Sequence, residues 1–232
     1  VLLAPPLSGE RADARSLIDR FVWRPERPLT VIVMDKNDLA RRRLYELPAR
    51  FLFHIGNAWE DGTGVIRVDA CLYDDAHYAV QATRDMALRG VVEAPRARPA
   101  QIVLHPDGRS GIDALPGPGE FPRIDPRRVG ERQRYTYGVI PNGVARWDWT
   151  AGGSATIQYG AAYWAEEPVF VPRNGDAETR GWILQTRLNA ASAQTELVVL
   201  DARAVEDGPV AVLACPYALP LGFHGHFVGA VV

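Results

Sequence analysis

The chain has 232 residues, of which 47% are hydrophobic and 23% charged, as in an ordinary globular protein that can bury a substantial core. With 26 basic and 28 acidic residues, its formal net charge is -2, which gives no electrostatic reason to expect a nucleic-acid partner. It holds no apolar run of about 18 residues, so we expect no transmembrane helix, while peripheral membrane contact stays open.

The cysteines bear on the redox setting of the protein, and the first residues bear on whether the chain is part of a longer one. Cys71 and Cys215 are too few for a disulfide framework and have no metal-site spacing, which favours a reducing, cytoplasmic setting. The chain begins without Met on the apolar run Val1–Pro6, which lacks the basic region of a signal peptide. We therefore expect a part of a longer protein.

Short runs rich in Val, Ile, Tyr, Phe and Trp recur along the whole chain and are separated by Gly, Pro, Asn and Asp. This alternation predicts an all-β fold with tight turns. The predicted strands cover residues 29–34, 51–54, 65–73, 101–104, 135–140, 155–159, 169–172, 182–188, 196–200, 210–214 and 223–228. Helical turns are expected only around 38–43 and 78–88, and the Pro- and Gly-rich residues 115–122 predict a long loop between strands.

Five dipeptides suit turns that need a positive φ and so connect antiparallel strands. They are Asp61-Gly62, Asp107-Gly108, Asn142-Gly143, Asn174-Gly175 and Asp207-Gly208. A sandwich, a barrel and a propeller can all hold so many short strands, and periodicity alone does not separate them. At about 40 to 45 residues per blade, the chain would make about five propeller blades.

The five histidines stand in different contexts. His105 lies in a Pro-Asp-Gly turn and His77 beside two aspartates, so both are expected at the surface. His54 closes an apolar run and is followed by polar residues, which suits either a metal ligand or a hydrogen-bonded core histidine. His224 is flanked by glycines that allow close approach to the backbone; if the segment is extended, His226 points to the same face, and we expect at most one of the two to reach a central site.

Two glutamates stand beside apolar, Pro-containing segments. Glu120 precedes Phe121-Pro122, and Glu167 precedes Pro168-Val169. A carboxylate in such a setting is costly to bury unless it is paired or hydrogen-bonded. The simplest partners are the nearby arginines Arg123 and Arg173, in ordinary salt bridges.

Together these segments resemble the carotenoid cleavage oxygenases, a family that includes stilbene-cleaving members. Residues 53–60, Phe-His-x-x-Asn-Ala-x-Glu, and residues 222–225, Gly-Phe-His-Gly, are similar to the segments that carry the family's third and fourth iron-binding histidines. Residues 120–124 and 167–173 are similar to the segments whose glutamates hydrogen-bond such histidines. The four segments occur in the family's order, and residues 2–7 resemble the strand that follows the second histidine.

The resemblance implies a fold, a metal and a reaction. It implies that residues 1–232 are the C-terminal portion of a single seven-bladed β-propeller domain, whose other blades, two histidines and one glutamate lie upstream. His54 and His224 would bind Fe(II), with Glu120 and Glu167 behind them. The implied enzyme is a non-haem dioxygenase that uses O2 to cleave a carbon–carbon double bond of an apolar alkene into two carbonyl products; carotenoid, apocarotenoid, stilbene and phenylpropene substrates all stay open.

Two other classes of function remain open on the residues alone. A propeller that binds a partner without catalysis would need no upstream ligands. A carbohydrate hydrolase would use Glu120 and Glu167 as an acid and base pair, which would leave both histidine motifs unexplained.

Overall fold

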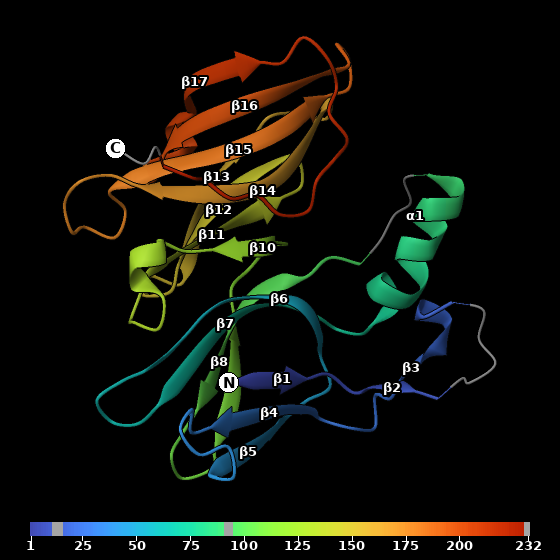
Figure 1. Ribbon diagram of the computed structural model, residues 1–232, viewed down its shortest axis with the longest axis vertical. Helices are drawn as coiled ribbons and strands as arrows, with labels where there is room; N and C mark the ends of the chain where they lie inside the picture. Colours follow the sequence, from blue (N-terminus) through green and yellow to red (C-terminus); the bar gives the residue numbers. More distant parts are fainter. Residues whose placement is uncertain (11–15, 91–94, 230–232) are drawn as a thin grey trace.

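The structure is a computed structural model that describes residues 1–10, 16–90 and 95–229, and its regular secondary structure is mainly β-strand (Figure 1). The strands are β1 (Leu2–Ala4), β2 (Leu7–Gly9), β3 (Phe21–Trp23), β4 (Leu29–Met34), β5 (Arg42–Leu47), β6 (Phe51–Glu60), β7 (Ile66–Tyr73), β8 (Arg98–Leu104), β9 (Ser110–Ala114), β10 (Glu120–Arg123), β11 (Tyr135–Ile140), β12 (Gly143–Asp148), β13 (Gly153–Gln158), β14 (Tyr163–Pro172), β15 (Gly181–Asn189), β16 (Gln194–Asp201) and β17 (Pro209–Ala214). The expected all-β class is confirmed.

Helices are short and few among the described residues. The π-helix η2 (Tyr78–Ala82) runs into α1 (Thr83–Arg89), which confirms the helical turns expected around 78–88. Three 3-10 turns, η1 (Ile18–Arg20), η3 (Pro126–Arg128) and η4 (Val205–Asp207), complete the set. None of the helices in the described ranges is long and apolar enough to cross a membrane. The cytoplasmic location stays a prediction.

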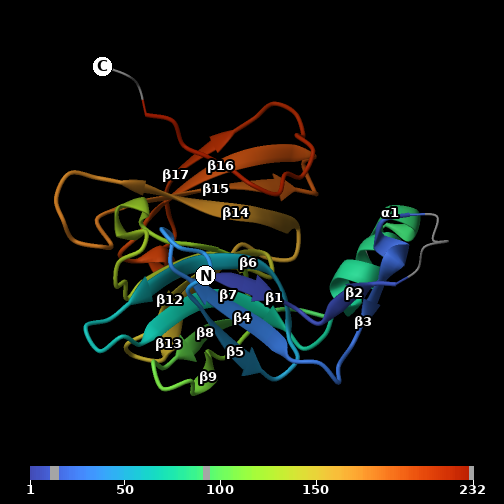
Figure 2. The ribbon, with the colours of Figure 1, turned by 60° about the horizontal axis from the view of Figure 1, so that its bottom comes forward.

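Three antiparallel sheets have four strands each, and in each the spatial order equals the chain order. They are β6-β7-β8-β9, β10-β11-β12-β13 and β14-β15-β16-β17. A fourth sheet, β1-β4-β5, has three strands, and β2 and β3 form a separate hairpin that lies beside η2 and α1 (Figures 1 and 2). Successive four-stranded meanders are the architecture of propeller blades, while the expected total of seven blades stays a prediction.

The core lies between neighbouring sheets, and each sheet packs its face on the next one. Val31 and Val68 belong to the cluster that joins the β1-β4-β5 sheet to the β6–β9 sheet. Tyr137 and Ile183 belong to the cluster that joins the third sheet to the fourth. Because β10 contacts both β6 and β14, the first strands of three consecutive sheets meet in the middle of the molecule (Figure 1).

Most predicted strands coincide with observed ones, and β4 and β11 have the predicted bounds. Three predictions were wrong. The helical turn around 38–43 is a turn leading into β5, because pairing with β4 overrides the local preference. The loop predicted over 115–122 ends at Gly119, since Glu120–Arg123 form β10, and the strand predicted over 223–228 is an irregular segment.

Candidate metal centre

Backbone irregularities occur in the first strand of each four-stranded sheet. The pairing register shifts between Leu52 and Ile55 in β6, between Glu120 and Arg123 in β10, and between Ala165 and Pro168 in β14. Such bulges break the strict alternation of a strand and change where individual side chains point. His54, Glu120 and Glu167, three of the four predicted site residues, lie at these irregular positions.

His54 and Glu120 form the first pair of the site. The Nδ1 of His54 lies 2.7 Å from Glu120 Oε2, and both side chains are partly buried. The same oxygen accepts a hydrogen bond of 2.6 Å from the backbone N–H of Phe121. Glu120 Oε1 is buried without a hydrogen-bond partner among the described residues. Since a carboxylate can only accept, Nδ1 is the protonated ring nitrogen of His54 and Nε2 is left free.

His224 and Glu167 form the second pair. The Nδ1 of His224 lies 3.0 Å from Glu167 Oε1, while Glu167 Oε2 accepts hydrogen bonds from the backbone N–H of Gly225 and from Arg123 Nη2. Burial alone would raise the pKa of Glu167. The hydrogen bonds from Arg123, Gly225 and His224 outweigh burial and hold this pKa below its ordinary value, so Glu167 stays ionised.

The two pairs meet. The imidazole rings of His54 and His224 lie 5.0 Å apart, edge to face, with an interplanar angle of 79°. The ring of Phe121 stacks on His54 at 4.6 Å and meets His224 at 5.5 Å, so the three rings form one cluster.

The two histidine–carboxylate pairs are chemically suited to bind a metal ion. Each imidazole has its Nδ1–H held by a carboxylate and its Nε2 available, which is the arrangement that usually orients metal-binding histidines. The residues described here contain no group of three or more His, Cys, Asp or Glu that could by itself hold an ion. Two imidazoles are too few for an iron site, so further donors would have to complete the coordination.

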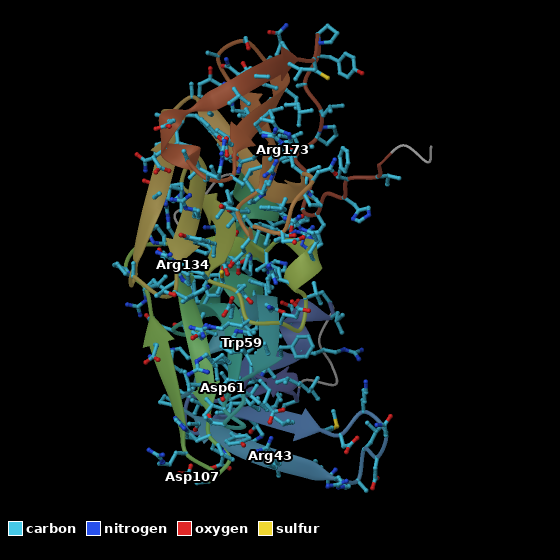
Figure 3. The ribbon with its side chains drawn as sticks, turned by 90° about the vertical axis from the view of Figure 1, so that its left-hand side faces the viewer. Arg43, Trp59, Asp61, Asp107, Arg134 and Arg173 are labelled. Carbon is cyan, nitrogen blue, oxygen red and sulfur yellow. The ribbon has the colours of Figure 1, made fainter. Side chains whose placement is uncertain are left out.

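The remaining histidines lie elsewhere or play no part in the pairs. His77 is exposed, as expected. His105, which was also expected at the surface, is half-buried; it lies two residues before Asp107, which Figure 3 shows far from Arg173. His226 lines a cavity of about 200 Å³ beside His224 but makes no contact with His54 comparable to that of His224.

Of the salt bridges considered for the two glutamates, the structure contains one, between Arg123 and Glu167. Arg123 pairs with Glu167 and not with Glu120, and Arg173 lies over the Trp182 ring. Because each carboxylate faces an imidazole, the acid and base pair of a hydrolase finds no support here.

Sequence reasoning missed Phe121, the role of Arg123 toward Glu167, and Glu166. The motif around Glu120 contains both Phe121 and Arg123, but no sequence pattern states which glutamate an arginine will reach. The doublet Glu166-Glu167 was a visible signal for a second carboxylate near the site.

The chain is similar in sequence to a protein family and to several characterised enzymes. The sequence model of the retinal pigment epithelial membrane protein family matches residues 1–229. The isoeugenol monooxygenase of Pseudomonas putida is 26% identical, over 94% of this chain and 49% of its own length. The carotenoid 9,10(9',10')-cleavage dioxygenase of Crocus sativus is 28% identical, over 80% of this chain and 38% of its own.

A solved structure shows the same fold. Cobalt-substituted apocarotenoid oxygenase of Synechocystis superimposes with a TM-score of 0.78 at 22% identity, over 91% of this chain and 46% of that protein. The chain thus spans about half the length or less of the relatives it matches. With its family model matched over nearly the whole chain, the protein belongs to the retinal pigment epithelial membrane protein family, the carotenoid oxygenase family that its motifs resemble.

Proposed function

We propose that this chain is part of an Fe(II)-dependent dioxygenase that uses O2 to cleave a carbon–carbon double bond of a carotenoid, apocarotenoid or stilbene-type substrate, giving two carbonyl products. The observation that carries the proposal is the meeting of two histidine–carboxylate pairs, with the rings of His54 and His224 only 5.0 Å apart. The names of two relatives, a carotenoid 9,10(9',10')-cleavage dioxygenase and an isoeugenol monooxygenase, support an oxygenase reaction.

In this proposal His54 and His224 bind the metal through Nε2. Glu120 and Glu167 accept the Nδ1–H of each ring, which fixes the tautomer, holds the ring plane and makes Nε2 a better donor. The carboxylates also bring negative charge close to a cation held by neutral imidazoles. When bound, Fe(II) would supply the redox chemistry that O2 needs to react with an alkene. The cobalt in the Synechocystis relative supports a metal site in this fold.

The surroundings of the pairs suit an apolar substrate. Phe53, although 43% exposed, meets the rings of Tyr73 and Tyr78 at 5.6 and 5.8 Å and lies beside His54. Burial, with a contribution from the charge of Glu120, raises the pKa of the Tyr73 phenol, so this residue stays neutral. On the other side Phe223 lies near Phe121 and is 74% exposed. These rings offer apolar contact area to a long or aromatic alkene.

We further propose that residues 1–232 are the C-terminal portion of a single propeller domain in a longer polypeptide. The β1-β4-β5 sheet has three strands where the next three sheets have four, and the relatives are about twice as long. The site residues His54, Glu120 and Glu167 all come from first strands of four-stranded sheets. Equivalent strands of further blades would supply the ligands that two imidazoles lack.

The test uses the complete natural polypeptide that contains this chain, purified without air and loaded with Fe(II). Incubation with an apocarotenoid or a stilbene under O2 should give two carbonyl fragments by mass spectrometry, and His54→Ala should abolish them. Stoichiometric iron binding without carbonyl products from any of these alkene classes would reject the reaction.

A further inference from the structure

The segment that carries His224 has no regular secondary structure of its own. Residues 215–228, here called the C-terminal strap, follow β17 and form neither helix nor strand. Much of the strap is exposed, including Phe223 and the His224 side chain. Since few buried apolar contacts hold it, its position depends on individual hydrogen bonds to the sheet beneath.

These hydrogen bonds are distributed along the strap. Thr195 holds its first part, because Thr195 Oγ1 accepts from the backbone N–H of Leu219 at 2.8 Å. Glu167 holds its last part through the backbone N–H of Gly225 at 2.8 Å and through His224. Between them lies Gly222, two residues before His224.

Glu166 holds Gly222. Its Oε1 accepts from the backbone N–H of Gly222 at 2.5 Å, and its Oε2 accepts from the Thr186 hydroxyl on the neighbouring strand β15. In a regular strand Glu166 and Glu167 would point to opposite faces. The bulge between Ala165 and Pro168 lets both adjacent carboxylates reach the strap.

We propose that Glu166 is a positioning residue for His224. Glu166 and Glu167 bracket the histidine by binding the backbone at Gly222 and Gly225, and Thr186 keeps the Glu166 carboxylate in place. Glycine adopts more backbone conformations than any other residue, so the path of residues 222–225 depends on these two acceptors and on Arg123, whose Nη2 donates to the carbonyl oxygen of Gly225 at 2.8 Å. The inference rests on the proposed function in one respect only, namely that His224 is a metal ligand.

The variants separate the hydrogen bond from the charge. Glu166→Gln keeps an oxygen for Gly222, and its amide can donate to Thr186, whereas Glu166→Ala removes both contacts. Glu178→Ala is the control: the Glu178 carboxylate accepts hydrogen bonds from the backbone N–H groups of Arg134 and Tyr135, as Glu166 does from that of Gly222, but it holds a different loop. Thr186→Val is a milder variant in case Glu166→Ala does not fold.

Two readouts are taken on the complete polypeptide. The first, on the metal-free protein, is amide hydrogen exchange of residues 219–225, which we expect to become about tenfold faster in Glu166→Ala, less so in Thr186→Val, and unchanged in Glu166→Gln and Glu178→Ala. The second is Co(II) affinity from the visible absorption of the bound ion, which we expect to fall about tenfold in Glu166→Ala and to recover in Glu166→Gln.

Hydrogen exchange that is unchanged in both Glu166→Ala and Thr186→Val would overturn the inference. It would also be overturned if Glu166→Ala exchanged faster but kept the parental Co(II) affinity, while His224→Ala bound Co(II) more weakly. If His224→Ala itself binds Co(II) as the parent does, the proposed function fails at this ligand. The exchange measurement needs no metal and then still decides whether Glu166 holds the strap.

Discussion

The rings of His54 and His224 lie 5.0 Å apart, edge to face, although one belongs to strand β6 and the other to the irregular C-terminal strap. Each ring is held from behind by a glutamate of a further strand, Glu120 of β10 or Glu167 of β14. The relationship therefore depends on three consecutive sheets and the strap at once. Substitutions at single residues of this arrangement test what each contact contributes to metal affinity and to stability.

The carboxylate of Glu120 should matter for metal affinity. Glu120→Gln removes its charge while an amide oxygen can still accept from His54 Nδ1, so we expect Fe(II) or Co(II) affinity to fall about tenfold, as outer carboxylates typically contribute. Chelator competition measures the affinity. Glu131→Gln, at an exposed glutamate paired with Arg128, is the control and should match the parent. Equal affinities in all three proteins would show that Glu120 does not act on a metal through His54.

Phe121 has a backbone conformation that favours glycine. Its φ is 52°, and the left-handed region costs a residue with a Cβ roughly 1–2 kcal/mol. Both Phe121→Ala and Phe121→Gly lose the ring, but only Gly relieves the backbone, so Phe121→Gly should be the more stable by about 1 kcal/mol in urea unfolding.

At a strand position with ordinary negative φ the stabilities have the opposite order: a protein with Gly there is less stable than one with Ala by roughly 0.5–1 kcal/mol. Ala155→Gly in β13, at a position without positive φ, should show that opposite order. A Phe121→Ala variant at least as stable as Phe121→Gly would contradict the strain.

Gly138 allows β11 to approach the site. A Cβ there would overlap the Trp147 ring and lie 2.8 Å from the carbonyl oxygen of Glu120, so Gly138→Ala must displace Trp147 or β10. Overpacking of this kind typically costs roughly 1–3 kcal/mol of unfolding free energy, and displacement of β10 should also weaken metal retention. Gly111→Ala in β9 meets nothing within 4 Å and should keep parental stability and metal. Parental behaviour of Gly138→Ala would refute the close approach.

Asp69 should make stability fall as the pH rises. Burial, partly opposed by hydrogen bonds from Gln101 and Thr136, raises the pKa of Asp69 from 3.8 to about 6. A carboxyl whose pKa is raised on folding stabilises the fold below the unfolded pKa, and this contribution is lost as the pH rises through 6. The change in pKa corresponds to about 3 kcal/mol between about pH 4 and pH 7.

Asp69→Asn should remove this pH dependence from urea unfolding, with Gln101 turning its amide to accept from the new side chain. Asp148→Asn is the control: hydrogen bonds from Arg134 lower the pKa of Asp148 to about 2, so its effect on stability should be the same at pH 5 and pH 7. An Asp69→Asn variant with the parental pH dependence would exclude Asp69 as its source.

Part of the fold follows directly from local sequence. Strands β4 and β11 have the predicted bounds because β-branched and aromatic residues fill them and Pro28 and Pro141 flank them. Residues 223–228 of the strap were predicted as a strand, yet the strap is held by the side chains of Glu166 and Glu167 and not by a neighbouring strand. The sequence of the segment itself does not show whether its backbone will pair with a strand or with side chains.

The site shows the same division. The four motifs led to His54, His224, Glu120 and Glu167, and the structure brings them together as two pairs. The assignment of Arg123 to Glu167 could not be predicted, because it depends on how β10 packs against β14. Their roles toward a metal stay a prediction.

The most direct test is the iron content of the complete polypeptide, purified without air, in the parent and in His54→Ala, His224→Ala and His105→Ala. We expect about one iron per parent molecule, a loss in the first two variants, and the parental value in His105→Ala, whose histidine lies away from both pairs. Equal iron in all four proteins would contradict the assignment of His54 and His224 as ligands, and a folded parent without iron would contradict the metal centre itself.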